Sequence, residues 1–487
     1  MAEAATKSKR GDLTQGRIGP TLLAFALPTL ASSILQSLNG TVNAIWVGRF
    51  LGESALAATS NANMVMFLLT AFVFGFGMAA TILIGQAWGR KDVDAARRIF
   101  GTAAGSFGVI TIMIAIAGFQ LSPAILHLLG TPGDAAPLAL AYLRVIFLAM
   151  PALLLLTLLM MALRGAGDSM TPLWFMIVAV VLDGGLNPVF IIGLGPAPRL
   201  GIAGSATATL IANYAALIGL LAYMYARDLP LRLRGRELRY LVPSPAILRT
   251  MIAKGLPMGI QMIVISVSAL ALVGMVNREG VDTTAAFGVA LQLWTYVQMP
   301  AMALGAAVSA MAAQNIGAGK WDRVGQITRS GVGYTLAITG ALIVLLTLAD
   351  RTVLALFMGG GSPALPIAKH IHLVATWNFL LFGVTMVLIG TVRANGAVWA
   401  PLIILAIGLV PVRFGWIFGT YSWLGADAIW SSFPVSSFVN VALALAYYLH
   451  GGWRKARMTI DTRPDDDECT EDALATREPG GALNPAG

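Results

Sequence analysis

The chain has 487 residues, of which 57% are hydrophobic and only 11% are charged, and its mean hydropathy is +0.77. Soluble proteins carry about a quarter charged residues, so this composition excludes an ordinary soluble enzyme or binding module. Apolar runs of about 20 residues, which match a bilayer core of about 30 Å, recur along the chain. We therefore predict an all-α polytopic membrane protein, because a β-barrel would show short strands of alternating polarity.

Twelve membrane-spanning helices are predicted, six in each half of the chain. In chain order they cover residues 20–45, 55–84, 96–118, 137–161, 170–193, 203–226, 247–276, 284–312, 325–349, 366–392, 399–421 and 425–449. An even number of spans places both termini on the same side of the membrane.

Lys and Arg residues predict which side that is. They gather in the segments that a cytoplasmic N-terminus leaves inside the cell, including Lys7, Arg90, Arg97 and the stretch from Arg227 to Lys254. By the positive-inside rule, we expect both termini in the cytoplasm and the chain in the cytoplasmic (inner) membrane. The net charge of +9 then reflects topology and contact with anionic lipid headgroups, and we expect no nucleic-acid partner.

The two ends of the chain differ in composition from the membrane body. Residues 1–18 form a basic tail without a small-residue cleavage site, so we predict no removed signal peptide. Residues 451–487 contain the acidic run DDDE and a terminal PGGALNPAG, which is typical of a disordered tail. Cys469 in this tail is the single cysteine, so no internal disulfide is possible.

The sequence repeats itself at an offset of about 229 residues. GQAWGRKD at 85–92 returns as AQNIGAGKWD at 313–322, and LRGAGDSMTP at 163–172 returns as VRANGAVWAP at 392–401, which pairs Arg164 with Arg393. Six spans per repeat is an even number, so both halves have the same orientation and are related by a pseudo-two-fold axis along the membrane normal. We predict two six-helix lobes, residues 19–226 and 247–450, joined by a basic cytoplasmic linker at 227–246. Their interface is expected to hold a cavity that works by alternating access.

Asp183 is the only acidic residue that falls deep inside a predicted span. A charge at that depth costs at least about 2.5–3.5 kcal/mol, so it is a functional candidate by default. Asn187 lies four residues later on the same helical face, and Pro188 removes the hydrogen bond to the Gly184 carbonyl. Carboxylate, amide and carbonyl oxygens together suit Na⁺, whereas burial favours the protonated acid and a proton carrier. A third interpretation is a purely structural Asp183 that caps or pairs with a neighbouring helix.

Other polar side chains recur at helical spacing and suggest a polar pocket in the N-terminal half. One face of the first span carries Ser32, Gln36, Asn39 and Asn43, and one face of the sixth carries Ser205, Thr209 and Asn213. Candidate lining residues for a cavity that accepts planar organic cations are Gln261, Trp294, Gln298, Trp377 and Asn378. Interhelical hydrogen bonding and core packing are the alternative explanations for each of them.

Arg413 also falls inside an apolar span. The 229-residue offset places it at the repeat equivalent of Gly184, next to that of Asp183. Arg413 is therefore a candidate cavity residue that could pair with Asp183 across the lobes. Snorkelling or a structural contact is the alternative.

Motifs of soluble enzymes are missing from the sequence. It contains no glycine-rich loop with lysine of the Walker type, so ATP is not expected to drive the protein directly. His370 and His372 are two residues apart and would point away from one another on a helix, so we predict an exposed pair and no metal site. We expect no enzyme activity and no cofactor other than a coupling ion, H⁺ or Na⁺.

Four motifs in order resemble those of multidrug and toxic compound extrusion (MATE) transporters. They are LPTLASSILQSLNGTVNAIWVGRFLG, GQAWGRKD, LRGAGDSMTP and LDGGLNPVFIIGLG followed by GIAGSATATL, and the resemblance covers about residues 19–450. It implies two six-helix lobes around a V-shaped cavity, and export of cationic or amphipathic organic compounds in exchange for H⁺ or Na⁺. We expect a monomer. The rival within transport is a flippase for lipid-linked or polysaccharide cargo, which would need a more basic cavity.

The sequence departs from the MATE pattern at the residues that matter most. Asn43 stands where the family often has an acid in the first span. In the fifth span the acid and the amide are exchanged, so that Asp183 matches the family's Asn and Asn187 its Asp. The resemblance thus implies a cation pocket of Asn43, Asp183, Asn187 and Thr209 with one carboxylate, and one coupling ion per cycle.

Overall fold

The computed structural model describes residues 11–128, 136–194, 198–359, 362–456 and 458. The first ten residues and the acidic tail with Cys469 therefore lie outside the described residues. The N-terminal half consists of α2 (Ile18–Leu51), α3 (Glu53–Gly89), α4 (Val93–Leu128), α5 (Ala136–Gly165), α6 (Met170–Pro188) with the π-helical segment η1 (Val189–Gly193), and α7 (Ile202–Ala226). The 3-10 helix η2 (Gly235–Leu241) lies in the linker and packs on α4.

The C-terminal half follows the same order of spans, with additional short helices and two spans divided into shorter helices. It consists of α8 (Pro245–Val276), η3 (Asn277–Glu279), α9 (Val281–Gly317), α10 (Trp321–Leu348), α11 (Asp350–Met358), α12 (Ala364–Ala375), α13 (Asn378–Ala394), α14 (Trp399–Ile407), the π-helical segment η4 (Gly408–Val412), α15 (Arg413–Leu424), α16 (Asp427–His450) and η5 (Gly452–Lys455). The short helix α11 was not predicted.

The membrane helices confirm the all-α polytopic architecture. Among the described residues, eleven helices are long and apolar enough to cross a membrane, or twelve if α12 and α13, bent by 42° at their junction, form one span. The prediction of a straight helix over 366–392 missed this bend, because hydropathy does not register a change of direction inside an apolar run.

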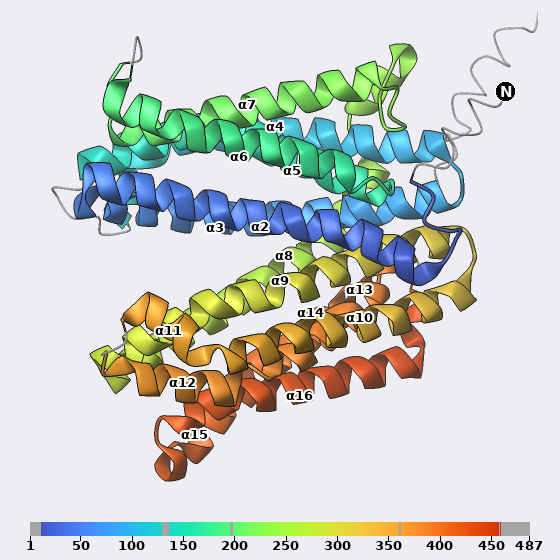
Figure 1. Cartoon of the computed structure of the whole chain (residues 1–487). Helices are drawn as coiled ribbons and strands as arrows, with labels where there is room; N and C mark the ends of the chain where they lie inside the picture. Colours follow the sequence, from blue (N-terminus) through green and yellow to red (C-terminus); the bar gives the residue numbers. More distant parts are fainter. Residues whose placement is uncertain (1–10, 129–135, 195–197, 360–361, 457, 459–487) are drawn as a thin grey trace, which may run out of the picture.

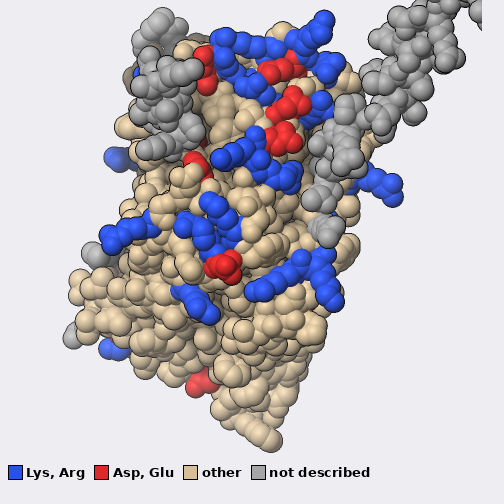
Figure 2. Space-filling view, turned by 90° about the vertical axis from the view of Figure 1, so that its right-hand side faces the viewer, with Lys and Arg blue, Asp and Glu red and all other residues tan. Residues whose placement is uncertain are grey.

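The helices form two groups that approach each other at one end of the molecule. Helices α2–α7 lie together, α8–α16 lie together, and the two groups diverge away from the end near the N-terminus (Figure 1). Between the groups, α3 packs against α8 and α9, and α2 packs against α9. Figure 2 looks onto the end where the groups approach and shows many Lys and Arg side chains over it. The exposed Lys91, Arg234 and Lys320 are in turns that connect helices.

Two glutamines related by the repeat join the lobes at this end. Gln86 Nε2 on α3 donates to the carbonyl of Ala394 on α13 (2.7 Å), and Gln314 Nε2 on α9 donates to the carbonyl of Gly165 on α5 (3.1 Å). Each bond crosses from one lobe to the other. The repeated GQAWG and AQNIG motifs are therefore structural parts of the junction.

Two glycines allow this close approach. A Cβ on Gly89 would lie 1.9 Å from the Gln314 carbonyl oxygen, and one on Gly317 would lie 2.1 Å from the Gln86 carbonyl oxygen. No real side chain tolerates such distances, so the backbones meet only because both positions are glycine. The contact has the pseudo-two-fold symmetry of the sequence repeat.

The N-terminal segment before α2 is attached to this junction. The Leu13 amide donates to Gln314 Oε1 (2.9 Å), and Asn315 Nδ2 donates to the Leu13 carbonyl (3.1 Å). Lys320 Nζ also donates to the Thr14 carbonyl (2.9 Å). Part of the predicted tail at 1–18 therefore closes one end of the lobe interface.

Candidate functional site

Asp183 is buried in the N-terminal lobe. It lies on α6, which packs against α2 and α7, and only 2% of its surface is exposed. Asn187, one turn further along the same face of α6, is fully buried. The i, i+4 spacing read from the sequence thus places both polar groups in the same inter-helix layer.

Four side chains donate hydrogen bonds to the Asp183 carboxylate. Oδ2 accepts from Asn39 Nδ2 (2.8 Å) and Asn43 Nδ2 (2.9 Å) of α2. Oδ1 accepts from Thr209 Oγ1 of α7 (3.0 Å) and Asn187 Nδ2 of α6 (3.1 Å). Three helices therefore surround one carboxylate with neutral donors. This arrangement suits the ionised form, since an ionised carboxylate only accepts hydrogen bonds.

Asn187 connects the carboxylate to the rest of the cluster. Its Nδ2 also donates to Asn43 Oδ1 (2.8 Å) and to the backbone carbonyl of Asp183 (2.9 Å). The Gly184 carbonyl, which we expected in this group, forms no hydrogen bond with these side chains. Two amide oxygens, Asn39 Oδ1 and Asn187 Oδ1, are buried without a hydrogen-bond partner.

The unpaired amide oxygens are groups that a bound cation or a protonated acid could use if the amides turned. Turning a carboxamide by half a turn exchanges its N–H donors for its oxygen, and buried oxygens without partners are costly. With Asn39 or Asn187 turned, the cluster presents oxygens beside Asp183 instead of donors. Such an arrangement can accept the O–H of a protonated acid or coordinate Na⁺. The cluster can therefore respond to the charge at Asp183.

Pro188 marks a change of helix type rather than a break. Helix α6 continues through it into the π-helical segment η1, and Met170–Gly193 forms one span. Proline lacks the N–H of the α-helical ladder, and single π-helical turns are often found at functional sites. The expected bend is therefore a local widening next to Asn187.

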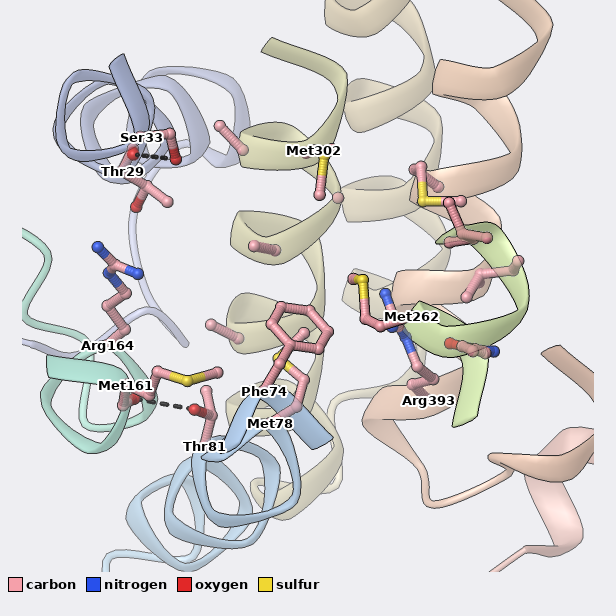
Figure 3. Close-up of a pocket in the computed structure, with 18 of the residues that line it drawn as sticks. Thr29, Ser33, Phe74, Met78, Thr81, Met161, Arg164, Met262, Met302 and Arg393 are labelled. Atoms are coloured by element: carbon pink, nitrogen blue, oxygen red, sulfur yellow. Dashed lines mark hydrogen bonds between the residues drawn. The ribbon is translucent and has the colours of Figure 1, made fainter. Parts of the chain in front are cut away.

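A second polar feature lies between the lobes. A pocket of about 150 Å³ is lined by residues of α2, α3 and α5 on one side and of α8, α9, α13 and α14 on the other. Gln261 belongs to this lining, as do Arg164 and Arg393. Figure 3 shows these two arginines entering from opposite sides of the pocket. Both arginines lie just beyond the ends of the predicted spans at residues 161 and 392, although their pairing in the repeat is visible in the sequence.

Most other predicted cavity residues lie elsewhere. Trp294 is 2% exposed, packs edge-on or tilted against Phe287, Phe379 and Phe433, and donates through Nε1 to Thr376 Oγ1 (2.8 Å). This placement agrees with the core-packing alternative.

The remaining polar candidates also lie outside the pocket lining. Asn378 is buried, donates to the Ala375 carbonyl (2.6 Å) and accepts from Ser437 Oγ (3.1 Å). Gln36 and Trp377 are exposed, and Gln298 is partly buried. Asn39 belongs to the Asp183 cluster described above.

Arg413 pairs with residues of its own lobe. Its Nη2 donates to Ser436 Oγ on α16 (3.0 Å), and its guanidinium lies 4.7 Å from the centre of the Phe433 ring. No ion pair with Asp183 occurs among the described residues. The structural alternative therefore matches the geometry.

The two histidines differ from the prediction of an exposed pair. His370 Nε2 lies 2.8 Å from Asp427 Oδ1, but His372 is only 2% exposed and its Nδ1 lies 2.8 Å from Thr376 Oγ1. The two side chains point to different sides of α12, and His372 lies on the side that packs against α9 and α16. Within the described ranges, no three His, Cys, Asp or Glu residues are grouped to hold a metal ion.

The MatE family model matches the chain at residues 28–189 and 257–416. The chain belongs to the MatE family, whose members are membrane transporters. The two matched segments begin at the 229-residue offset of the internal repeat, so each lobe corresponds to one copy of the family unit.

Relatives and solved structures agree with this assignment. "Probable multidrug resistance protein YoeA" of Bacillus subtilis is 37% identical over 89% of this chain and 94% of its own. "Probable multidrug resistance protein YpnP" of the same organism is 30% identical over 92% and 99%. The crystal structure of MATE in complex with MaL6 superposes with a TM-score of 0.83 at 20% identity, over 92% of this chain and 98% of that one. That likeness shows the same two-lobed fold.

Proposed function

We propose that this MatE family protein is a secondary active antiporter of the cytoplasmic membrane that exports organic compounds, cationic or amphipathic, in exchange for H⁺, with Na⁺ as the less favoured ion. The observation that carries the proposal is the Asp183 carboxylate, buried and held by four neutral donors. The names of the multidrug resistance relatives support the cargo class.

The cluster suggests how the ion and the cargo are exchanged. The described arrangement suits an ionised Asp183, because each of its two carboxylate oxygens accepts two hydrogen bonds. Binding H⁺ or Na⁺ removes the negative charge, and the turned amides of Asn39 and Asn187 then face the bound ion. Because Asn39 and Asn43 lie on α2, the charge state of Asp183 acts on the helix that packs against α9 of the other lobe. Occupancy of the ion site can therefore bias the approach of the lobes and the release of cargo.

The orientation proposed from the sequence fits this scheme. The basic end of the molecule, where the lobes meet through Gln86 and Gln314, would face the cytoplasm, and the diverging end would face outward. The described conformation would then be closed toward the cytoplasm.

The decisive experiment measures efflux of ethidium from vesicles that contain the purified protein. A proton gradient and a sodium gradient are imposed separately. We expect the proton gradient to drive efflux, and Asp183→Asn to reduce the rate to that of protein-free vesicles while the thermal unfolding profile is preserved. Undiminished gradient-driven efflux from Asp183→Asn would refute the coupling role. Efflux driven only by sodium would identify Na⁺ as the ion.

A further inference from the structure

The pocket between the lobes contains buried hydrogen-bond donors without acceptors. Arg393 is 6% exposed, and the Nε atoms of Arg164 and Arg393 and the Nε2 atom of Gln261 are buried without a hydrogen-bond partner. No ion pair or side-chain hydrogen bond joins either guanidinium to another residue in the part of the chain that the structure describes. All three groups can only donate at these atoms.

The lining carries no opposite charge. Neither Asp nor Glu is among the residues that line the pocket, and Asp183 is not one of them. Both arginines lie in the last turn of their helices, α5 and α13. The negative end of a helix dipole favours cations there, which helps to explain why two charges are tolerated. It does not satisfy their N–H groups.

The rest of the lining is apolar and adaptable. It includes the methionines Met78, Met161, Met262, Met302 and Met386, together with Phe25 and Phe74. The hydroxyl groups of Thr29, Ser33 and Thr81 are neutral, and their O–H groups donate to backbone carbonyls. Unbranched methionine side chains adjust to ligands of different shape. A ligand for this pocket needs an acceptor-rich head and an apolar body.

We propose that this pocket is a binding site for amphipathic organic anions, whose carboxylate or phosphate head is held by Arg164, Arg393 and Gln261. Guanidinium groups match the geometry of both oxyanions. The volume of about 150 Å³ holds the head group, and the body lies along the methionines. One arginine comes from each lobe, so a ligand that fills the pocket contacts both. The role of such anions as cargo rests on the proposed antiport, whereas their binding does not.

Binding is tested on the purified full chain in phosphatidylcholine nanodiscs with two matched fluorescent probes. One is the anion 2-naphthoate and the other the cation 2-naphthyltrimethylammonium. We expect the anion to bind more tightly than the cation. Arg164→Gln and Arg393→Gln should each weaken anion binding by about tenfold or more, since a hydrogen bond to a charged group is lost. Arg393→Lys, which keeps the charge, should weaken it less.

Arg144→Gln is the matched control. Arg144 lies on the same helix as Arg164 but contacts the Phe119 ring (5.1 Å) and is not in the pocket lining. This variant should bind 2-naphthoate as the wild type does. Thermal unfolding without ligand identifies variants that fail to fold. Equal affinity for both probes, or folded Arg164→Gln and Arg393→Gln variants with unchanged affinity, would overturn the proposal.

A lipid-exchange measurement distinguishes a lipid headgroup from a free organic anion as the ligand. The design of the assay also distinguishes this proposal from the antiport proposal. If a lipid headgroup fills the site, replacing part of the phosphatidylcholine by phosphatidic acid should weaken 2-naphthoate binding in the wild type. If a free organic anion fills it, this lipid change should have no effect. Both results agree with an anion-binding site in this pocket. The binding assay needs no gradient, so a wild-type protein without gradient-driven ethidium efflux would refute the antiport proposal without affecting this one.

Discussion

The equivalent helices of the two lobes carry opposite charges in similar frames. In the N-terminal lobe, α6 passes into the π-helical segment η1, and Asp183 is held by donors from three helices. In the C-terminal lobe, α14 passes into η4 and then α15, where Arg413 is held by Ser436 and Phe433 of one neighbouring helix. Both halves of the repeat carry a buried charge at this place. Side chains from three helices donate to Asp183, whereas Arg413 contacts residues of one helix.

The prolines explain why the two frames are not superimposable. Pro188 ends α6 directly before η1, whereas Pro411 lies inside η4. At an offset of 229 residues, the two prolines are not equivalent, so the π-helical turn comes earlier in the C-terminal copy. Asp183 therefore precedes its turn and Arg413 follows the other one. The shifted π-helical turn gives the two charged residues different neighbours.

Burial of a charged side chain inside a span does not by itself make an ion site. Arg413 is 8% exposed, close to the value for Asp183. Its partners are a hydroxyl and an aromatic face, neither of which is left with an unpaired group that a second state could use. Asp183, in contrast, lies beside the buried unpaired oxygens of Asn39 and Asn187.

The largest effect is expected when the acid of the N-terminal copy is moved by one turn. Asp183→Asn should abolish proton-driven ethidium efflux. Adding Asn187→Asp should restore it, because position 187 already contacts Asn43 at 2.8 Å. We expect recovery on the order of a tenth of the wild-type rate, since a misplacement of about 1 Å can cost as much as about 100-fold. The measurement is the initial efflux rate in vesicles with an imposed proton gradient. A folded double variant as inactive as Asp183→Asn would show that the site depends on Asp183 itself.

A smaller effect is expected at the junction that both copies share. Gly89→Ala and Gly317→Ala each force a Cβ against a backbone carbonyl of the other lobe. Overpacking costs about 1–3 kcal/mol, and only the closed junction bears this cost, so the ratio of closed to open molecules should fall by about 5- to 150-fold. The readout is the distance between spin labels at Lys91→Cys and Lys320→Cys in a Cys469→Ser background.

The control for this prediction is Gly108→Ala on α4, where an added Cβ meets nothing within 4 Å. It should leave the label distance unchanged. Because Gly89 and Gly317 are equivalent in the repeat, the two variants should lengthen the distance to the same extent. A change in only one of them would contradict the symmetric junction.

Much of the fold and part of the candidate site were predictable from the sequence. Hydropathy and the repeat predicted the helices, and the spacing of Asn39, Asn43, Asp183 and Asn187 predicted polar faces that the structure brings together. These are local periodicities, which a single helix already determines. Thr209 was predicted on a polar face by the same spacing, and the resemblance to MATE transporters implied its place in the cation pocket.

What the sequence did not predict depends on contacts between distant helices. Arg164 and Arg393 were counted as loop charges because hydropathy falls at the end of a helix, whether or not another lobe covers that end. Trp294 was assigned to a cavity because an aromatic side chain suits a ligand cavity and an aromatic core equally well. His372 is buried because α12 packs against α9 and α16, and these contacts are not recorded in any pattern within one span.

The smallest effect on transport is expected from Arg413. If the charge in the C-terminal copy is structural, Arg413→Met should keep proton-driven efflux within about twofold of the wild type, because among the described residues the substitution leaves no buried acid without its partner. The free energy of unfolding should change by at most about 2 kcal/mol, the size of a desolvated cation–π contact with Phe433. Thermal unfolding and vesicle efflux measured on the same preparation test both expectations. Normal stability with lost proton-driven efflux would place Arg413 in the coupling path and remove the contrast between the two lobes.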